Sequence, residues 1–418
     1  MIRRRLDAAG TWLLAGTAAL CIALLLGLLL LLLRAGLAPF WPAPVIELSL
    51  HDGRVLLGEV VSSEPDSLVL RGSERARIGD AYSRVALADI AMRTQPPDAL
   101  ALQLADGRRL FGRGDEAAVL AGALAPARVL EATRPNADGP IARIGLFARA
   151  AARFVGTRPD ASALGGGMLP ALLGTVTLVL LMSILVMPLG IATAVYLHQR
   201  RGFLARSVRG AVNLLAGVPS IVYGVLGLGL FVHGIGAGID RWFYAERLPV
   251  PTFGSGGLLW AALTLALLTL PVVVVSVEEG LARIPAGLRD GALALGATGD
   301  EAVWGLLLPA ARPAVLTGLI LAVARAAGAV APLMLVGVVK LAPALPLDGT
   351  FPYLHPSRQF MHLGFEVYDA ALASADAIRG VPRAYACALL LVVVVVVLNL
   401  SAILLRNRLR ERYRALET

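Results

Sequence analysis

One arginine stands alone inside a long apolar stretch. Arg325 lies in Pro313–Val339, which contains no other charged residue. Placing a guanidinium in a hydrocarbon layer costs about 2.5 kcal/mol or more, so such a group normally faces a cavity or an opposite charge. Its planar fork can bind two oxygens of one anion. The position predicts either an anion-contacting residue or a structural ion pair with a neighbouring chain.

A proline inside a second apolar stretch marks another candidate site. Pro219, in Gly210–Val232, cannot donate a helical hydrogen bond and tends to break the helix, which leaves backbone N–H groups near Ser220 free. Such a broken helix end has a positive dipole that can hold an anionic group. Tyr223 follows one turn later. The alternative is a proline kink that binds no ligand.

The remaining reactive side chains do not predict covalent chemistry. No metal-ligand spacing or nucleophile–base pair is visible, and Asp52 belongs to a turn motif, so we expect no catalytic residues, metal or cofactor. The only lysine is not in a Gly-Lys-Ser/Thr phosphate loop, so we expect ATP to be hydrolysed by a partner chain. The residues considered are His51, His198, His233, His355, His362, Cys21, Cys387 and Lys340.

Six apolar stretches are long enough to hold these side chains in membrane-crossing helices. A hydrocarbon layer about 30 Å thick needs roughly 20 helical residues. Five of the six stretches contain no Asp, Glu, Lys or Arg, in a chain that is 16% charged. We therefore predict an all-α polytopic membrane protein with six transmembrane helices. The predicted spans are Trp12–Leu33, Met168–Leu197, Gly210–Val232, Ser255–Val277, Pro313–Val339 and Ala384–Leu405.

The positive charges indicate an orientation. Arginines concentrate in the N-terminal stub, in loops 198–209 and 278–312, and in the C-terminal tail. With six spans, these four segments all lie on the same side of the membrane. Short positive loops face the cytoplasm, so both termini are expected there. The net charge of +9 is explained by these helix ends and by anionic lipid. We expect no nucleic-acid partner.

Residues 37–165 are predicted to form a small β-rich insertion outside the cytoplasm. Asp52-Gly53 between alternating apolar and polar residues predicts a hairpin with a type I′ turn. The segment Leu48–Gly58 is repeated at Leu102–Gly112, and a further strand is expected at Ser67–Arg71. Residues 115–167 are expected to be helical or irregular. The other divisions are residues 1–36 (stub and first span), 166–408 (five further helices) and 409–418 (tail).

The loop between the fourth and fifth spans, residues 278–312, predicts two short helices. Pro285 suits the first turn of one helix and Gly296 its left-handed C′ position. Thr298 and Glu301 predict a capping box for the second helix, which Pro309 ends. The apolar side chains of Leu288, Leu293 and Leu295 have no membrane to enter, so a protein partner is expected to cover them.

This loop resembles the EAA motif of ABC-importer permeases. The positions that match the motif, at its spacing, are Asp290, Gly291, Ala292, Gly296, Leu306, Leu308 and Pro309. Asp replaces the family's Glu, Gly its first Ala, and Leu its Ile. The resemblance implies a coupling helix that docks into an ATPase subunit, with Asp290 as the acidic contact. A merely amphipathic loop with a glycine hinge is the alternative.

Other segments resemble phosphate permeases of the PstA and PstC type. Leu215–Gly224 is similar to a signature of both, and Ala324–Gly328 is similar to a stretch in which the arginine is a pathway residue. The resemblance covers about 166–408 and implies a pathway role for Pro219, Ser220, Tyr223 and Arg325. It departs at Ala329, where the family has glutamate. Further PstA-like segments are Pro170–Leu181, Pro188–Leu197, Ala294–Thr298 and the outer-loop run Phe365–Tyr368.

The resemblance implies the MetI-like fold of type I ABC importers. The chain would form half of a translocation pathway for inorganic phosphate in the bacterial cytoplasmic (inner) membrane. The implied partners are two ATPase subunits, a homologous permease, an extracytoplasmic phosphate-binding protein and membrane lipid. A permease of the same fold for molybdate or sulfate is one alternative. A membrane-anchored extracytoplasmic sensor is another.

Overall fold

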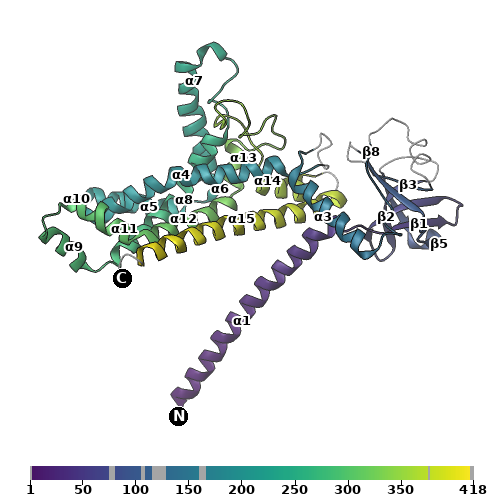
Figure 1. Cartoon of the computed structure of the whole chain (residues 1–418), viewed down its shortest axis with the longest axis horizontal. Coiled ribbons are helices and arrows are strands. Elements are labelled where there is room, and N and C mark those ends of the chain that lie inside the picture. The colour runs from purple at the N-terminus through teal and green to yellow at the C-terminus, as the bar shows by residue number, and fades with distance from the viewer. Residues whose placement is uncertain are drawn as a thin grey trace. The chain divides into compact units, whose positions relative to one another are not determined.

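The computed structural model describes residues 2–74, 81–104, 109–114, 129–159, 166–374 and 377–414. It divides into two compact units, which Figure 1 shows in one view. The first unit is Met1–Leu169 with Val367–Leu389, and the second is Pro170–Glu366 with Leu390–Thr418. Strands β1 to β8 all lie in the first unit, and the apolar helical bundle lies in the second.

The first unit contains two antiparallel sheets. The larger has the strand order β4-β3-β2-β1-β5 and the smaller has the order β7-β6-β8. Alternate residues of β1 point into a core that includes Ile46, Leu48 and Leu50, as the alternating pattern requires. The bounds are β1 Val45–Leu50, β2 Val55–Ser63, β3 Ser67–Glu74, β4 Ala81–Ala86, β5 Ile90–Thr94, β6 Ala99–Leu104, β7 Arg109–Arg113 and β8 Val129–Thr133, with a 3-10 turn η2 at Leu87–Asp89.

The two sheets repeat one three-stranded unit. Leu48 of β1 pairs with Leu56 of β2, and Leu102 of β6 pairs with Leu110 of β7, which is the same register shifted by 54 residues. A third strand flanks each central strand, β5 beside β1 and β8 beside β6, with a register shift at the corresponding position. The predicted duplication is confirmed and extends to a third strand that the sequence pattern did not indicate.

The first hairpin turn differs from the predicted type I′ turn. Gly53 has a φ of +84°, whereas Asp52 has no positive φ. The Gly53 N–H donates to the Leu50 carbonyl (3.0 Å), and Asp52 accepts the Arg54 N–H (2.9 Å). A three-residue loop of this kind needs one left-handed residue instead of two, and glycine supplies it. The corresponding turn at Asp106-Gly107 lies outside the described residues.

Residues 115–167 also differ from the prediction, because they include strand β8. This strand pairs with β6, far away in sequence, so no local pattern marks it. Helix α3 (Pro140–Gly156) follows, with proline at its first position, where a missing N–H removes no helical hydrogen bond. The unit also holds α1 (Ile2–Leu37) and η1 (Ala38–Phe40), and no part of the most apolar window of α1 is buried inside the chain.

The second unit is a bundle of long apolar helices. Its main members are α4 (Leu169–Gln199), α8 (Leu258–Ala282) and α12 (Arg312–Ala327), with the C-terminal part of α15 (Ala377–Arg414) (Figure 1). Of the apolar windows, that of α8 is 67% buried and that of α4 39%, so α8 is the central helix. In the described residues, five single helices and one bent pair are long and apolar enough to cross a membrane.

The predicted third span, Gly210–Val232, is wrong at its start. The chain breaks at Val218-Pro219, because Pro219 has an extended ψ of 139° and cannot donate a helical hydrogen bond. An amphipathic helix, α5 (Phe203–Gly217), precedes the break, and the apolar helix runs from Ser220 to Phe243. That helix comprises α6 (Ser220–Leu226), the π-helical η3 (Gly227–Gly236) and α7 (Ala237–Phe243), and the 3-10 turn η4 (Ala245–Arg247) follows it.

The predicted fifth span, Pro313–Val339, is not one helix. α12 ends at Ala327 and α13 (Ala331–Val336) begins after a break. Pro332 explains the break, because it cannot donate a hydrogen bond to the carbonyl four residues earlier, at Gly328. α12 is joined at its other end to the helical run Gly299–Ala310 by a bend of 65°.

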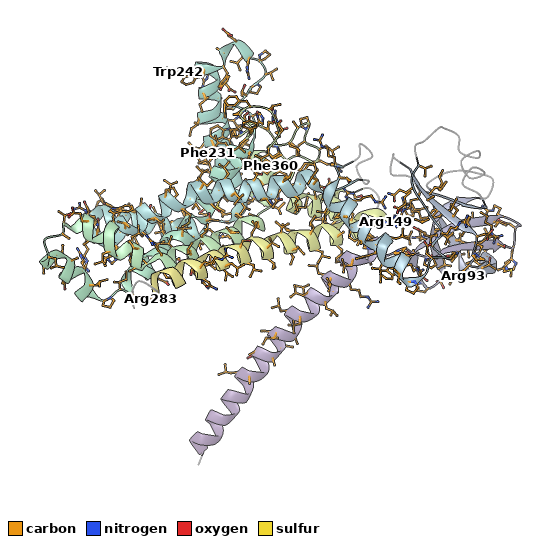
Figure 2. The ribbon with its side chains drawn as sticks, viewed as in Figure 1. Arg93, Arg149, Phe231, Trp242, Arg283 and Phe360 are labelled. Carbon is orange, nitrogen blue, oxygen red and sulfur yellow. The ribbon has the colours of Figure 1, made fainter. Side chains whose placement is uncertain are left out.

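A cluster of polar side chains lies near the start of α8, where the Leu258 N–H donates to the Arg358 carbonyl (3.0 Å). Asp348 accepts hydrogen bonds from Arg358 and Thr350 and pairs with His355 (2.9 Å). The Arg358 guanidinium, more than the others, holds the pKa of Asp348 far below its usual value. α14 (Leu363–Tyr368) and the π-helical η6 (Asp369–Ala373) lie between residues 340 and 383, and α7 carries Trp242 (Figure 2).

Candidate functional site

The helix break at Pro219 positions the first group of candidate residues. Pro219 is the N-cap of α6, and Ser220 is its first residue; both are exposed. The Val222 N–H donates to the Pro219 carbonyl (3.0 Å), so the amides of Ser220 and Ile221 are the ones that the break leaves without helical partners. The structure therefore produces the open helix end that the sequence predicts.

Tyr223 bridges this break. Its side chain is buried, and its hydroxyl donates to the Leu215 carbonyl near the end of α5 (2.5 Å). The Leu215 carbonyl also accepts the Val218 N–H (3.3 Å), so the Tyr223 hydroxyl is its second donor, and this hydrogen bond joins α5 to α6 across Val218-Pro219. The Tyr223 phenol also lies within electrostatic range of the Arg325 guanidinium. The hydroxyl thus has a structural partner already, which the sequence could not reveal.

Arg325 lies in the last turn of α12, two residues before the helix ends. It is exposed, together with Ala324 and Gly328, and it forms no hydrogen bond or ion pair with any described residue. Leu321, one turn earlier on the same face, is 50% exposed. Arg325 therefore belongs to a surface of α12 that this chain does not cover. Ala329, where the sequence departs from the family, is half-buried beside the break.

The two helix breaks lie against each other. Gly224, one turn into α6, packs on α13: a Cβ at Gly224 would stand 2.8 Å from the Cα of Pro332 and 2.9 Å from its carbonyl oxygen. Only a residue without a Cβ allows the two backbones to approach so closely. This contact brings the Pro219 break and the Gly328 break, with Tyr223 and Arg325, into one region.

The second group of candidates forms a two-helix knob at the end of the bundle where α8 (Leu258–Ala282) ends. We use this name for residues 285–310, which comprise α9 (Ala286–Ala294), α10 (Gly299–Ala302), the π-helical η5 (Val303–Leu307) and α11 (Leu308–Ala310). Arg283 marks this end in Figure 2. Pro285 is the N-cap of α9, one position earlier than predicted, and Pro309 lies in the last turn of the second helix.

Gly296 ends α9 as predicted. Its φ is +92°, its N–H donates to Leu293 (3.0 Å), and the Ala297 N–H donates to Ala292 (3.1 Å). This pair of hydrogen bonds is the Schellman motif. The predicted capping box is also present: the Glu301 N–H donates to the Thr298 hydroxyl, and the Thr298 N–H donates to the Glu301 carboxylate (2.8 Å). These short-range bonds fix the angle between the two helices.

The knob presents an apolar and acidic surface. No residue of α9 is buried; Asp290 and Gly291 are exposed, and Asp290 has no hydrogen bond or ion pair within the described part of the chain. Leu295 is 92% exposed. Trp304, in η5, is 54% exposed and was not predicted from the sequence. An exposed tryptophan in a loop of charged and small residues was the available signal, since aromatic residues are enriched at interfaces.

The knob is tied to the membrane helices at more than one point. Gln199, the last residue of α4, donates to Asp300 (3.2 Å). Arg209 of α5 pairs with Glu278 of α8 (2.6 Å) beside the start of the loop. The run Gly299–Ala310 leads through the 65° bend directly into α12, the helix that carries Arg325. A displacement of the knob would therefore reach α4 and α12. Among the described residues, no group of three metal-ligating side chains is present.

Known proteins resemble part of this chain. A probable ABC transporter permease protein of Bacillus subtilis is 32% identical over 44% of this chain and 56% of its own length. A probable phosphate transport system permease protein PstA of Methanocaldococcus jannaschii is 29% identical over 45% of this chain and 63% of its own length. The chain thus spans less than two thirds of these relatives.

A phosphate transport system permease protein PstA 1 of Mycobacterium tuberculosis is 31% identical over 58% of this chain and 71% of its own length. A methionine ABC transporter structure is similar over 58% of this chain and 95% of its own, at 19% identity and a TM-score of 0.43. The model of the family "Binding-protein-dependent transport system inner membrane component" matches residues 186–415, more than half of the chain. The chain therefore belongs to this family of MetI-like membrane components.

Proposed function

We propose that this chain is the transmembrane permease subunit of an ATP-driven ABC importer for inorganic phosphate. The observation that carries the proposal is Arg325: an exposed guanidinium without an ion-pair partner in the described chain, beside two helix breaks within the apolar bundle. A cation within an apolar membrane span normally faces a pathway or a partner charge. The relatives named as phosphate transport permeases support phosphate as the anion.

The chemistry of the region suits a phosphate ion. Arg325 offers a planar donor pair for two phosphate oxygens. The open amides at Ser220 begin the helix Ser220–Phe243, whose dipole favours negative charge at that end. The Tyr223 hydroxyl donates to the Leu215 carbonyl and so holds this helix end to α5. Tyr223 would therefore position the amides and not bind the ion itself.

The knob is the proposed coupling element. Asp290, Gly291, Ala292, Gly296, Leu308 and Pro309 would contact an ATPase subunit, with Leu295 and Trp304 supplying exposed apolar area. Closure of two ATPase subunits would push the knob, and its continuity with α12 would carry the motion to Arg325. ATP is hydrolysed on those partners and not on this chain.

The proposal places both termini and the knob in the cytoplasm of a bacterial cell, with the chain in its cytoplasmic (inner) membrane. The positive loops support that orientation. The β-rich insertion would lie on the other side. A homologous permease would supply the second half of the pathway, and an extracytoplasmic phosphate-binding protein would deliver the substrate. Phosphate-binding residues of the partner permease would complete the site around Arg325.

Uptake of radioactive phosphate into proteoliposomes that contain the complete transporter tests the proposal. We expect Arg325→Ala to abolish uptake and Arg325→Lys to retain part of it, because a lysine keeps the charge without the fork. Leu321→Ala is the matched control, since it removes an exposed side chain from the same face of α12. Co-purification of the ATPase must be unchanged in all variants. Normal uptake by Arg325→Ala would contradict a pathway role.

A permease of the same fold for another oxyanion is the second candidate, because Ala329 replaces the family's glutamate four residues after Arg325. Competition of phosphate uptake by molybdate and sulfate separates the two: strong competition by either would favour it over phosphate. A purely sensory role predicts that no ATPase co-purifies and that Asp290→Ala and Gly296→Ala have no effect on any transport activity.

A further inference from the structure

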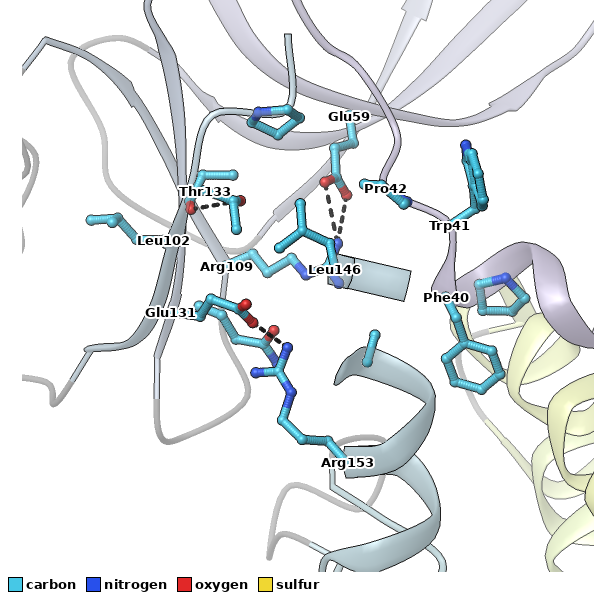
Figure 3. Close-up of a pocket in the computed structure, with 15 residues that line it drawn as sticks. Phe40, Trp41, Pro42, Glu59, Leu102, Arg109, Glu131, Thr133, Leu146 and Arg153 are labelled. Atoms are coloured by element: carbon cyan, nitrogen blue, oxygen red, sulfur yellow. Dashed lines mark hydrogen bonds and ion pairs between the residues drawn. The ribbon is translucent and has the colours of Figure 1, made fainter. Parts of the chain in front are cut away.

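Helix α3 contacts the β-strands of the first unit along one side. Arg153 donates to Glu131 of β8, and the Arg149 guanidinium lies 3.4 Å from the same carboxylate. Leu146, from the same side of the helix, lines a pocket together with Leu102 of β6 (Figure 3). This side of α3 therefore holds the insertion.

A second side of α3 packs on the end of the first span. The ring centroid of Phe40 lies 5.1 Å from that of Phe154 and 6.4 Å from that of Phe147, and Trp41 lies 5.9 Å from Phe147. Phe40 is the last residue of the apolar helical run Leu14–Phe40. Aromatic side chains are typical of the level at which a span leaves the hydrocarbon layer.

The C-terminal end of α3 is bonded to the start of the second span. The Met168 N–H donates to the Phe154 carbonyl (2.6 Å), and the Leu169 N–H donates to the Thr157 carbonyl (3.1 Å). Leu169 is the first residue of α4. Residues Phe147–Thr157 are therefore held at both points where the chain crosses the membrane boundary on this side.

The third side of α3 is apolar and uncovered. Ile141, Ile144, Ala148, Ala152 and Val155 are spaced by three or four residues and so share one face of the helix. All five are exposed; Ile141 is 87% exposed and Ile144 58%. We call these five residues the α3 stripe. No part of the described chain buries it.

We propose that the α3 stripe lies on the bilayer surface, so that α3 is an interfacial helix of the leaflet on the insertion side. The two membrane-boundary contacts place the helix where lipid headgroups begin, and an apolar face at that depth is covered by lipid. The opposite side of α3 binds the β-strands through Glu131. The helix thereby seats the duplicated β-module on the membrane. This proposal does not depend on the transported substrate.

Spin labels on the full-length chain in lipid nanodiscs test the proposal. In a background of Cys21→Ser and Cys387→Ala that retains the unmodified chain's elution profile and unfolding temperature, single cysteines are placed by Ala148→Cys and Ala152→Cys on the stripe. Ala142→Cys is the matched control, an exposed alanine on a different side of the same helix. Accessibility to oxygen, which enters lipid, is compared with accessibility to a water-soluble nickel chelate.

We expect the two stripe labels to be reached by oxygen and protected several-fold from the nickel chelate, whereas the control label is reached by the chelate. Equal chelate accessibility at all three positions would overturn the proposal, because the stripe would then face water. Dipolar broadening that disappears on dilution with unlabelled protein would show that a second copy covers the stripe. Protection that appears only with added transporter subunits would show that a partner chain does. Both outcomes would also overturn the proposal.

Discussion

The hinge of the two-helix knob offers the sharpest test of how local structure supports coupling. Gly296 has a φ of +92°, and a Cβ at this position would meet no atom within 4 Å. Gly296→Ala therefore adds no steric clash, and its cost is the backbone conformation alone. Placing a residue with a Cβ in the left-handed region costs roughly 1–2 kcal/mol.

Gly291→Ala is the matched substitution. It lies in the same short helix, in a helical conformation, and a Cβ there also meets nothing within 4 Å. Alanine is favoured over glycine inside a helix by roughly 0.5–1 kcal/mol, so this change should stabilise α9. The two glycine-to-alanine changes thus have opposite predicted signs at positions five residues apart.

Hydrogen exchange of the knob measures the difference. The amides of Gly296 and Ala297, bonded to Leu293 and Ala292, report on the end of α9. A cost of one to two kcal/mol raises the local opening constant by roughly 5–30-fold, so exchange in Gly296→Ala should accelerate by that factor, judged at Ala297. Gly291→Ala should slow it.

Gly296→Asn serves as an intermediate, because asparagine tolerates the left-handed region better than alanine does. ATPase stimulation by the complete transporter should fall in the order of the measured opening constants. The reasoning would be refuted if Gly296→Ala left exchange unchanged, or if both alanine substitutions shifted it in the same direction.

Three further substitutions probe the bundle and its outer loop. Tyr223→Phe removes the hydrogen bond to the Leu215 carbonyl and should lower stability by about 0.5–1.5 kcal/mol, seen as a lower unfolding temperature in detergent with phosphate uptake reduced but not abolished; complete loss of uptake with unchanged stability would instead indicate direct contact with the ion. Gly224→Ala forces α6 away from the Pro332 backbone and should strongly reduce the yield of folded protein, whereas Gly229→Ala, which meets nothing within 4 Å on the same helical run, should not; equal yields would show that the two breaks are not in contact. Burial lowers the pKa of His362 from 6.5 to about 4. The unfolded chain therefore protonates His362 first as the pH falls, so the contribution of His362 to stability is constant above about pH 6.5, decreases by roughly 3 kcal/mol between about pH 6.5 and pH 4, and levels off below. His362→Asn keeps an acceptor for the Gly364 N–H and should lose this pH dependence, which unfolding temperatures at pH 7 and pH 4.5 would detect; the same pH dependence in both proteins would contradict the assignment.

Features that depend on neighbouring residues were predictable from the sequence. The Schellman end at Gly296 and the capping box of Thr298 and Glu301 each close through bonds between residues at most five positions apart. The hairpin at Gly53 forms for the same reason, although one left-handed residue suffices where two were predicted. The apolar spans follow from composition, because a hydrocarbon layer demands a run of apolar side chains whatever their tertiary contacts.

The site itself could be predicted only in part. The sequence identified Arg325 as an isolated charge and Pro219 as a helix breaker, because both violate the pattern around them. It could not place the start of the third apolar helix or the second break at Gly328, which Pro332 imposes from the following helix. Nor could it show that the Tyr223 hydroxyl donates a hydrogen bond to the Leu215 carbonyl, since Leu215 lies on the other side of the break.

By itself, the sequence determined that this chain crosses a membrane several times, carries a duplicated β-hairpin and ends a loop helix at a glycine. Each of these features depends on the solvent that surrounds the chain or on residues that lie within one or two helical turns of each other in sequence. Only the tertiary structure decided that the Pro219 and Gly328 breaks meet, that β5 and β8 complete the two repeats, and that α3 packs on the end of the first span. Those arrangements depend on contacts between residues far apart in the chain, whose pairing no local spacing encodes.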